Sequence, residues 1–242
     1  MKQTQLIIAV LILLTAATAC QREDGDAGTK SSAGSAQPVT EASGYPKRYL
    51  VESGIIEFEM SGPQSGKETI YFDKWGWREA RYTNSELSIA GITRKENKLS
   101  IMDGDWVYNI DLERRTGTKV KNTLLPQFID GAKKKGQNMT ELGEEMLANM
   151  GGQKVGTEQV AGKTCDVWET KSLGSKSCVW QGVTLKTQVN MAGMQITSTA
   201  TRFEENGGVP ADRFVVPGDV VIKESIDPQS VLKGIREKTK GR

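Results

Sequence analysis

The side chains of this chain with the widest chemical repertoire are its three cysteines, Cys20, Cys165 and Cys178. Two of them lie in the segment AGKTCDVWETKSLGSKSCVWQG (161–182), and twelve residues separate them. Such a pair can be a redox-active dithiol, half of a zinc site or a disulfide. A redox dithiol is typical of C-x-x-C at the start of a helix, and zinc requires a second pair of ligands. Neither pattern occurs in the sequence, which therefore favours a disulfide.

The sequence around Cys165 and Cys178 is strand-like on both sides of a turn near Gly174. An antiparallel pair centred near Lys171 and Ser172 places the two cysteines directly opposite each other. Directly opposed residues lie about 4.5–5.5 Å apart, which is within reach of a disulfide. The spacing therefore predicts a structural cross-strand disulfide.

Other kinds of site find little support in the composition. The chain has no histidine, which excludes histidine-based triads and zinc sites with imidazole ligands. Its 32 basic and 30 acidic residues nearly balance, so we expect no nucleic-acid partner. The sequence contains no glycine-rich phosphate loop, nucleophile elbow or metal-ligand spacing. We predict a protein without catalytic residues, metal or cofactor, and a hydrolase that uses carboxylates is the weakest alternative.

The N-terminal segment MKQTQLIIAVLILLTAATAC resembles the signal peptides of bacterial lipoproteins. An apolar run over residues 6–17 follows Lys2, and it is shorter than the roughly 20 residues that span a bilayer. Cys20 comes directly after the small residues Ala-Thr-Ala. We expect residues 1–19 to be removed and Cys20 to be acylated. Ordinary cleavage, which releases a soluble periplasmic protein, is the alternative.

Acylation of Cys20 leaves Cys165 and Cys178 to pair with each other, and export supplies the oxidising compartment that a disulfide needs. The residue after Cys20 is Gln21 rather than aspartate, which in such lipoproteins favours sorting to the outer membrane. We therefore expect a monomer that contacts the outer membrane through its N-terminal lipid and faces the periplasm.

The chain divides into a tether and one domain. Residues 20–44 are rich in glycine, alanine, serine and threonine without a periodic apolar pattern, as in a flexible tether. Residues 45–242 are long enough for one domain with a core. In SGIIEFEMSG (53–62), Ile56, Phe58 and Met60 alternate with glutamates, which predicts a strand. Similar patterns recur, with turns expected at Lys74, Asp103-Gly104, Thr116-Gly117, Ala161-Gly162 and Ala192-Gly193.

Two helices interrupt the strands. The first is expected over residues 125–136, and the second over 138–150, where Asn138 and Glu141 form a capping box. A short strand at Phe214–Val216 and a final helix from Asp227 follow. These patterns predict a mainly β (α+β) fold: a strongly curved antiparallel sheet, or half-barrel, of about 9–11 strands covered by helices.

Three segments in this order, YLVESGIIEFEMSG, GTEQVAGKTCDVWE and VPADRFVVPGDV, resemble the LolA/LolB lipoprotein carriers. The similarity is closer to a poorly characterised family of envelope proteins in that superfamily, and it covers about residues 48–220. The resemblance implies a half-barrel whose cavity, under a helical lid, accommodates an acyl chain, a lipoprotein or another apolar ligand. An envelope module of the same fold that binds or senses another protein and carries no lipid is the alternative.

Two groups of apolar side chains are candidates for lining such a groove. Each group is also explained by ordinary core packing, and both interpretations remain open. The candidates are Phe58, Met60, Trp75 and Trp77 on predicted strands and Met139, Leu142, Met146 and Met150 on the second helix. Trp75 and Trp77 are expected on one strand face, beside Arg78 and Arg81, whose guanidinium groups can hold an anionic head group. Lys133–Lys135 are either a contact with an anionic surface or a solvated helix end.

Overall fold

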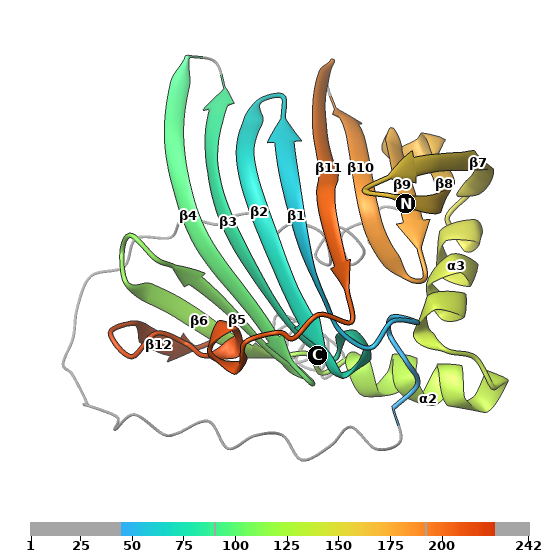
Figure 1. The fold of residues 1–242 in the computed structure, drawn as a ribbon, viewed down its shortest axis with the longest axis horizontal. Coiled ribbons are helices and arrows are strands. Elements are labelled where there is room, and N and C mark those ends of the chain that lie inside the picture. The colour runs from blue at the N-terminus through green and yellow to red at the C-terminus, as the bar shows by residue number, and fades with distance from the viewer. Residues whose placement is uncertain (1–44, 90, 192, 226–242) are drawn as a thin grey trace, which may run out of the picture. The chain divides into compact units, whose positions relative to one another are not determined.

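The structure of the protein is a computed structural model that describes residues 45–89, 91–191 and 193–225. In this part of the chain, twelve strands form one sheet, accompanied by two α-helices and three short 3-10 helices (Figure 1). The strands are β1 (Gly54–Ser61), β2 (Gln64–Asp73), β3 (Arg78–Ile89), β4 (Ile92–Asp103), β5 (Trp106–Asp111), β6 (Thr116–Lys121), β7 (Gln153–Val160), β8 (Lys163–Thr170), β9 (Ser175–Trp180), β10 (Val183–Met191), β11 (Met194–Glu205) and β12 (Val221–Glu224). The helices are α2 (Leu125–Lys135), α3 (Met139–Asn149), η1 (Lys74–Gly76), η2 (Lys171–Leu173) and η3 (Ala211–Phe214).

The sheet is an antiparallel meander in which β1 lies near the middle. Its strand order is β12-β6-β5-β4-β3-β2-β1-β11-β10-β9-β8-β7, and only β12 and β6 pair in parallel. Within the part of the chain that the structure describes, β12 and β7 each have one unpaired edge, so the curved sheet is open rather than a closed barrel (Figure 1). The predicted mainly β half-barrel with covering helices is confirmed. The expected 9–11 strands fall short of the observed twelve.

Two short segments differ from their predictions. Thr116 and Gly117 do not form a turn but begin β6, where Thr116 pairs with Asp111. Glycine suits that strand position because a Cβ at residue 117 would lie 2.8 Å from the carbonyl oxygen of Asn109. The strand expected at Phe214–Val216 is instead the end of η3 and the coil after it, because its apolar side chains pack onto the sheet rather than extend it.

Each face of the sheet carries its own apolar cluster. We call the inner face the side on which β1 and β2 place Ile56, Phe58, Ile70 and Phe72, which pack with Tyr49 and Val51. The opposite, outer face carries Ala80, Leu99, Ile101 and Ile110, which pack against the C-terminal residues Phe214, Val216, Val220 and Ile222. The inner cluster draws on β1, β2 and β7 to β11, and the outer cluster draws on β3 to β5, so the buried face changes across the width of the sheet.

The two α-helices begin and end at their local sequence signals. Asn138 Oδ1 accepts a hydrogen bond from the backbone N–H of Glu141, and the Glu141 carboxylate accepts one from the backbone N–H of Asn138. The predicted capping box is thus confirmed. Helix α2 ends at Gly136, which adopts the left-handed conformation with φ 66°. Thr140 Oγ1 donates to the carbonyl of Arg48, so α3 begins against the N-terminal segment that covers the inner face.

Candidate functional site

Cys165 and Cys178 form the predicted disulfide, with their Cα atoms 5.3 Å apart. The predicted register is wrong by two residues, because Cys178 pairs with Val167 and the disulfide runs diagonally between β8 and β9. The turn is longer than the spacing suggested, since β8 ends at Thr170 and β9 begins only at Ser175. Both sulfur-bearing residues are buried, so the pair staples two strands and presents no reactive thiol.

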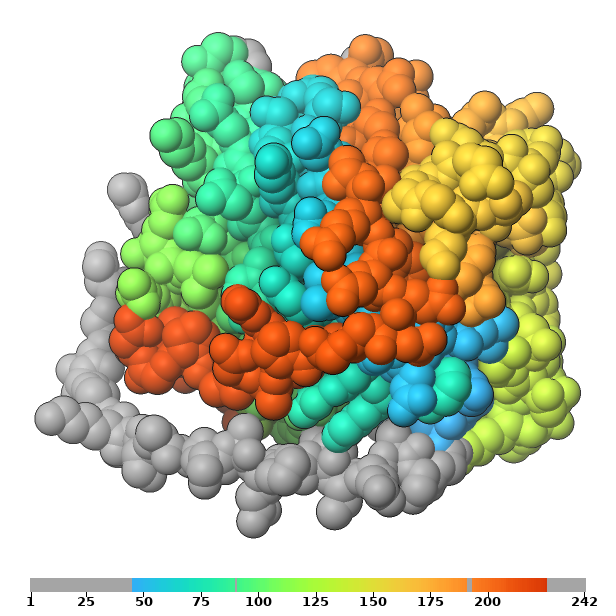
Figure 2. Space-filling view, in the orientation of Figure 1, coloured from blue at the N-terminus to red at the C-terminus, as the bar shows by residue number. Residues whose placement is uncertain are grey.

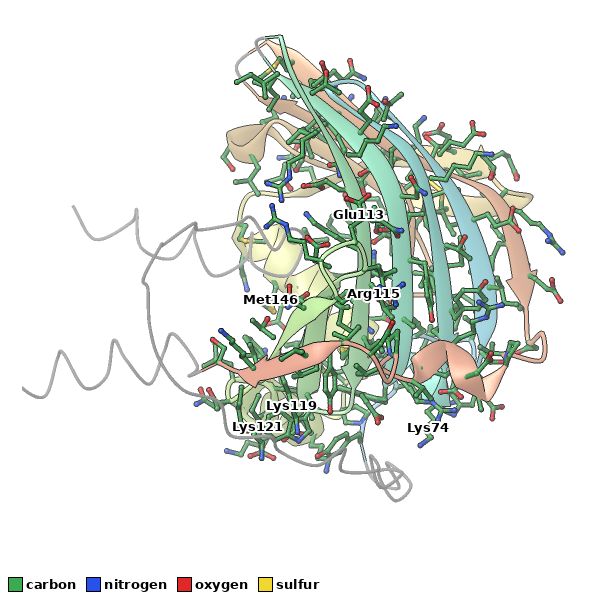
Figure 3. All side chains as sticks on the ribbon, turned by 90° about the vertical axis from the view of Figure 1, so that its left-hand side faces the viewer. Lys74, Glu113, Arg115, Lys119, Lys121 and Met146 are labelled. Carbon is green, nitrogen blue, oxygen red and sulfur yellow. A yellow bond between two sulfur atoms is a disulfide. The ribbon has the colours of Figure 1, made fainter. Side chains whose placement is uncertain are left out.

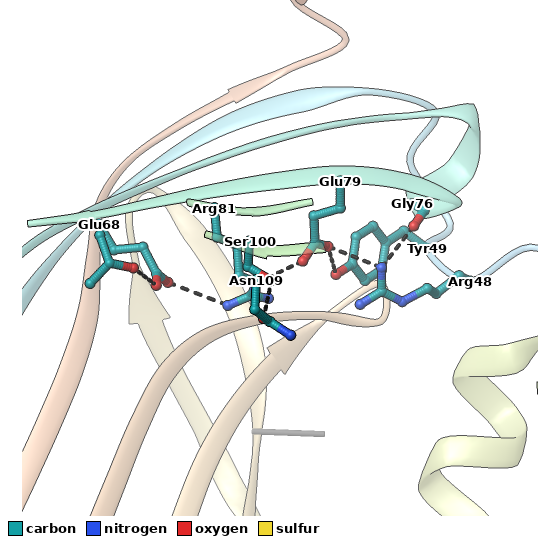
Figure 4. Close-up of polar contacts among 9 residues, drawn as sticks. Arg48, Tyr49, Glu68, Gly76, Glu79, Arg81, Ser100 and Asn109 are labelled. Carbon is teal, nitrogen blue, oxygen red and sulfur yellow. Dashed lines mark hydrogen bonds and ion pairs between the residues drawn. The ribbon is translucent and has the colours of Figure 1, made fainter. Parts of the chain in front are cut away.

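A network of ion pairs lies on the inner face (Figure 4). Glu79 on β3 is 4% exposed, and its pairing with Phe72 places it on this face. Its Oε2 accepts hydrogen bonds from Arg48 Nη1 at 3.0 Å and from Tyr49 Oη at 2.6 Å. Its Oε1 accepts one from Arg81 Nε at 2.7 Å. These three donors offset the cost of burying a carboxylate.

The protonation states of the network follow from its contacts. Burial raises the pKa of Glu79, but Arg48, Arg81 and the hydrogen bond from Tyr49 outweigh burial and hold that pKa at about 2. Burial raises the pKa of the Tyr49 phenol to about 12, despite the nearby Arg48. Burial lowers the pKa of Arg81, but the carboxylates of Glu79 and Glu68 raise it above the usual value. At neutral pH Glu79 is therefore a fixed carboxylate with no proton to donate.

Arg81 extends the network toward solvent. Its Nη1 donates to Glu68 at 3.3 Å, and Thr83 Oγ1 donates to the other oxygen of Glu68 at 2.9 Å. The Arg81 side chain is nevertheless 41% exposed. Ser100, which pairs with Arg81 across β3 and β4, donates to Asn109 Oδ1 at 3.2 Å. A guanidinium that two carboxylates orient and that solvent still reaches is suited to bind an anionic group.

The sequence had indicated Arg81 but not the acidic residues around it. Alternation in the stretch REARYT favours Ala80 and Tyr82 as the buried residues, with Glu79 on a wet face. Ala80 and Tyr82 do pack under the C-terminal segment on the outer face, but Glu79 and Arg81, opposite Phe72 and Ile70, lie on the inner face, where Glu79 is also buried. The sequence signal that could have identified this ion pair is the presence of opposite charges at positions i and i+2 of one strand, which place both side chains on the same face. Arg78 lies outside the network and pairs with Asp73.

Of the four groove candidates on predicted strands, two lie on the inner face and two do not. Phe58 is buried in the apolar cluster, and Met60 lies on the same face and is half-buried. The prediction that Trp75 and Trp77 share a strand face is wrong, because the chain reverses through η1 between β2 and β3. Trp75 adopts a left-handed conformation and stacks under Lys47 Nζ, 3.3 Å from its ring centre.

Trp77 is a core residue rather than a groove residue. Its side chain is 4% exposed, and its Nε1 donates to the carbonyl of Pro46 at 3.1 Å. The ring of Tyr45 packs edge-on against it at a centroid distance of 5.3 Å. Trp77 thereby fastens the N-terminal segment to the turn between β2 and β3.

The candidates on α3 are only partly covered by the protein. Leu142 is buried, whereas Met139, Met146 and Met150 are half-buried, and none of these methionines belongs to either apolar cluster. Figure 3 shows Met146 on α3, on the side toward which the strands curve. The side chains of the ion-pair network also project toward the helical side of the sheet (Figure 4). The structure thus brings a methionine stripe and a partly exposed arginine to the same side of the sheet.

Other expectations concern the lysines at the end of α2 and the chain ends. Lys133–Lys135 are exposed, and Lys135 pairs with Glu145 at 2.5 Å. Within residues 45–89, 91–191 and 193–225, no helix has the length and apolarity to cross a membrane. The same residues include no group of three or more acidic or cysteine side chains placed to hold a metal. Cys20, the signal segment, the tether and the helix from Asp227 lie outside the described residues.

Comparison with known proteins gives matches to structures only. No protein-family model matches the chain, and no curated protein does. An uncharacterised conserved protein from Thermus thermophilus is 9% identical with a TM-score of 0.46, covering 73% of this chain and 92% of its own. MucB in the MucA/MucB complex of Pseudomonas aeruginosa is 13% identical with a TM-score of 0.41, covering 69% of this chain and 56% of its own. At such low similarity, the site is interpreted from its own residues.

Proposed function

We propose that the protein is a non-enzymatic, lipid-anchored protein of the bacterial cell envelope that binds an amphipathic, acyl-chain-bearing ligand on its inner face. The observation that carries the proposal is the incompletely covered methionine stripe of α3, on the same side of the sheet as Arg81. The lipoprotein-like N-terminus and the disulfide support an exported protein.

The apolar part of the ligand contacts the methionines. Leu142 holds α3 in place, while Met146 and Met150 retain accessible surface. Methionine side chains are flexible and polarisable, so they adapt to acyl chains of different length and shape. Met60 offers a half-buried apolar contact on the sheet itself.

The polar end of the ligand contacts Arg81. The ion pairs with Glu68 and Glu79 hold the guanidinium in one place, which lowers the entropy lost when an anionic group binds. A carboxylate or phosphate then forms charge-assisted hydrogen bonds with it. Glu79 stays ionised beside two arginines, so it orients Arg81 and supplies no acid–base chemistry.

A binding experiment tests this proposal. The mature chain from residue 20, with Cys20→Ala, is titrated with a fluorescent fatty acid, and native mass spectrometry of the purified protein detects bound lipid. We expect Met146→Asp and Arg81→Gln each to weaken binding about tenfold, because each removes one favourable contact. Val155→Asp and Arg202→Gln change exposed residues elsewhere and are expected to leave binding unchanged. If the Cys20→Ala protein without further substitutions contains no bound lipid and takes up no fatty acid, the proposal is contradicted.

The anchor is tested separately, by covalent labelling. Cells grown with an alkyne-tagged palmitate are expected to incorporate the tag into the protein, and Cys20→Ala is expected to abolish incorporation. Gln21→Asp keeps the acylated cysteine and is expected to shift the protein from the outer to the inner membrane fraction. Tag incorporation that persists in Cys20→Ala contradicts the assignment of the anchor.

A second candidate function is the capture of a partner protein at the edge of the sheet. Among the described strands, β7 pairs only with β8, it is exposed over most of its length, and Val155 on it is 50% exposed. An extended segment of another protein can add to such an edge through backbone hydrogen bonds. Val155→Pro then abolishes partner binding without affecting fatty-acid uptake, which separates the two functions.

A further inference from the structure

The hairpins β1–β2, β3–β4 and β10–β11 end side by side at the same end of the sheet (Figures 1 and 2). The backbone N–H of Ser88 donates to the carbonyl of Pro63 at 2.7 Å, which joins the second hairpin to the first. Gly62 lies so close to the third that a Cβ at this position would be 2.1 Å from the Gln195 carbonyl oxygen. These contacts make the three hairpin ends one continuous surface, which we call the hairpin end.

The hairpin end is apolar at its most exposed positions. Ile92 is 74% exposed, Ile89 is 45% exposed and Met194 is 42% exposed. The turns of β3–β4 and β10–β11 have the matching sequences Ile-Ala-Gly-Ile and Met-Ala-Gly-Met. Large apolar side chains gathered on an exposed surface indicate a contact with an apolar partner.

The hairpin end is also free of charge, although 26% of the residues in the chain are charged. Residues 60–66, 87–93 and 187–201 contain no lysine, arginine, aspartate or glutamate. Strands rise about 3.3 Å per residue, so the nearest charges on β3–β4, Arg94 and Glu86, lie roughly 7 Å beyond Ile92 and roughly 10 Å beyond Ile89. Segments that bind at a membrane interface bury their apolar part by about 5–10 Å. The charge-free depth is therefore sufficient for the three turns to enter the headgroup region.

The charges that border this zone are of both signs. Lys67, Arg94 and Lys95 are exposed, and so are Glu59 and Glu86. The lysines and arginine can contact lipid phosphates once the turns have entered, while the glutamates limit attraction at a distance. We propose that the hairpin end docks onto a lipid surface through Ile89, Ile92 and Met194, with insertion of apolar side chains as the main contribution.

Docking of this kind brings the domain itself against the bilayer from which its ligand comes. It extends the proposed envelope function, and its test requires neither the acyl anchor nor an acyl ligand. Failure of this proposal is therefore distinguishable from failure of the proposed function.

Vesicle binding tests the hairpin end. The mature chain from residue 20, with Cys20→Ala and without the apolar signal segment, is sedimented with vesicles of phosphatidylethanolamine and phosphatidylglycerol. The double variant Ile92→Ser/Met194→Ser is expected to bind at least about tenfold more weakly, since it removes two inserted side chains. The matched control Val155→Ser/Val221→Ser removes two similarly exposed valines from the edge strands and is expected to bind unchanged. Equal weakening by both double variants overturns the proposal.

A spectroscopic readout keeps the test independent of folding defects. An exposed turn tolerates the introduction of a tryptophan. When vesicles are added, the emission of Ile92→Trp is expected to shift to the blue and to be quenched by brominated lipid. Val221→Trp is the control and is expected to show neither change. Emission from Ile92→Trp that is insensitive to vesicles overturns the proposal.

Discussion

Replacement of Glu79 by glutamine is expected to destabilise the protein and to remove part of its acid sensitivity. The carboxylate is 4% exposed and accepts hydrogen bonds from Arg48, Tyr49 and Arg81. Its pKa of about 2, compared with an ordinary value of 4.5, corresponds to roughly 3 kcal/mol of stabilisation. Because the pKa is lowered in the folded state, this stabilisation is fully present above about pH 4.5 and is lost as the pH falls toward 2.

The assay is urea unfolding of the Cys20→Ala protein, followed by tryptophan fluorescence across this pH range. We expect Glu79→Gln to lower the free energy of unfolding by about 3 kcal/mol at neutral pH, because two arginines lose their buried partner. The difference between the two proteins is expected to shrink as the pH approaches 2. Glu57→Gln, at an exposed ion pair with Arg202, serves as the control and is expected to cost less than about 1 kcal/mol. A constant difference at every pH refutes the reasoning.

Two further predictions concern the disulfide and the capping box. The double variant Cys165→Ser/Cys178→Ser opens a loop with a sequence separation of 13 and is expected to cost about 3 kcal/mol in unfolding free energy. The parent protein in reductant is expected to unfold at the same urea midpoint as the double variant. If neither the double substitution nor the reductant lowers the midpoint of the oxidised parent protein, the disulfide has no structural role. Asn138→Ala removes the cap of α3 and is expected to cost about 1 kcal/mol, whereas Asn149→Ala at the exposed end of that helix is expected to cost little. Equal effects of the two alanine substitutions argue against the cap.

Local signals were sufficient wherever the structure depends on neighbours in the chain. Strand alternation located β1, and the capping residues located α3 to within a residue. Cysteine pairing was also predictable, but its register was not, because η2 adds residues to the turn between β8 and β9. The alternation around Trp75 and Trp77 wrongly predicted a shared strand face, because the short helix η1 reverses the chain there and interrupts the strand.

Residue patterns alone were enough for most of the elements, the mainly β class and the pairing of Cys165 with Cys178. Contacts between segments distant in the chain set which face each strand buries and which hairpins meet. Glu79 lies opposite Phe72 on the inner face and is buried there by Arg48 and Tyr49, 31 and 30 positions earlier, while residues 211–222 cover the opposite face. The hairpin end is likewise a product of strand order, which places β11 beside β1. Such contacts depend on distant segments, so no local pattern of residues contains them.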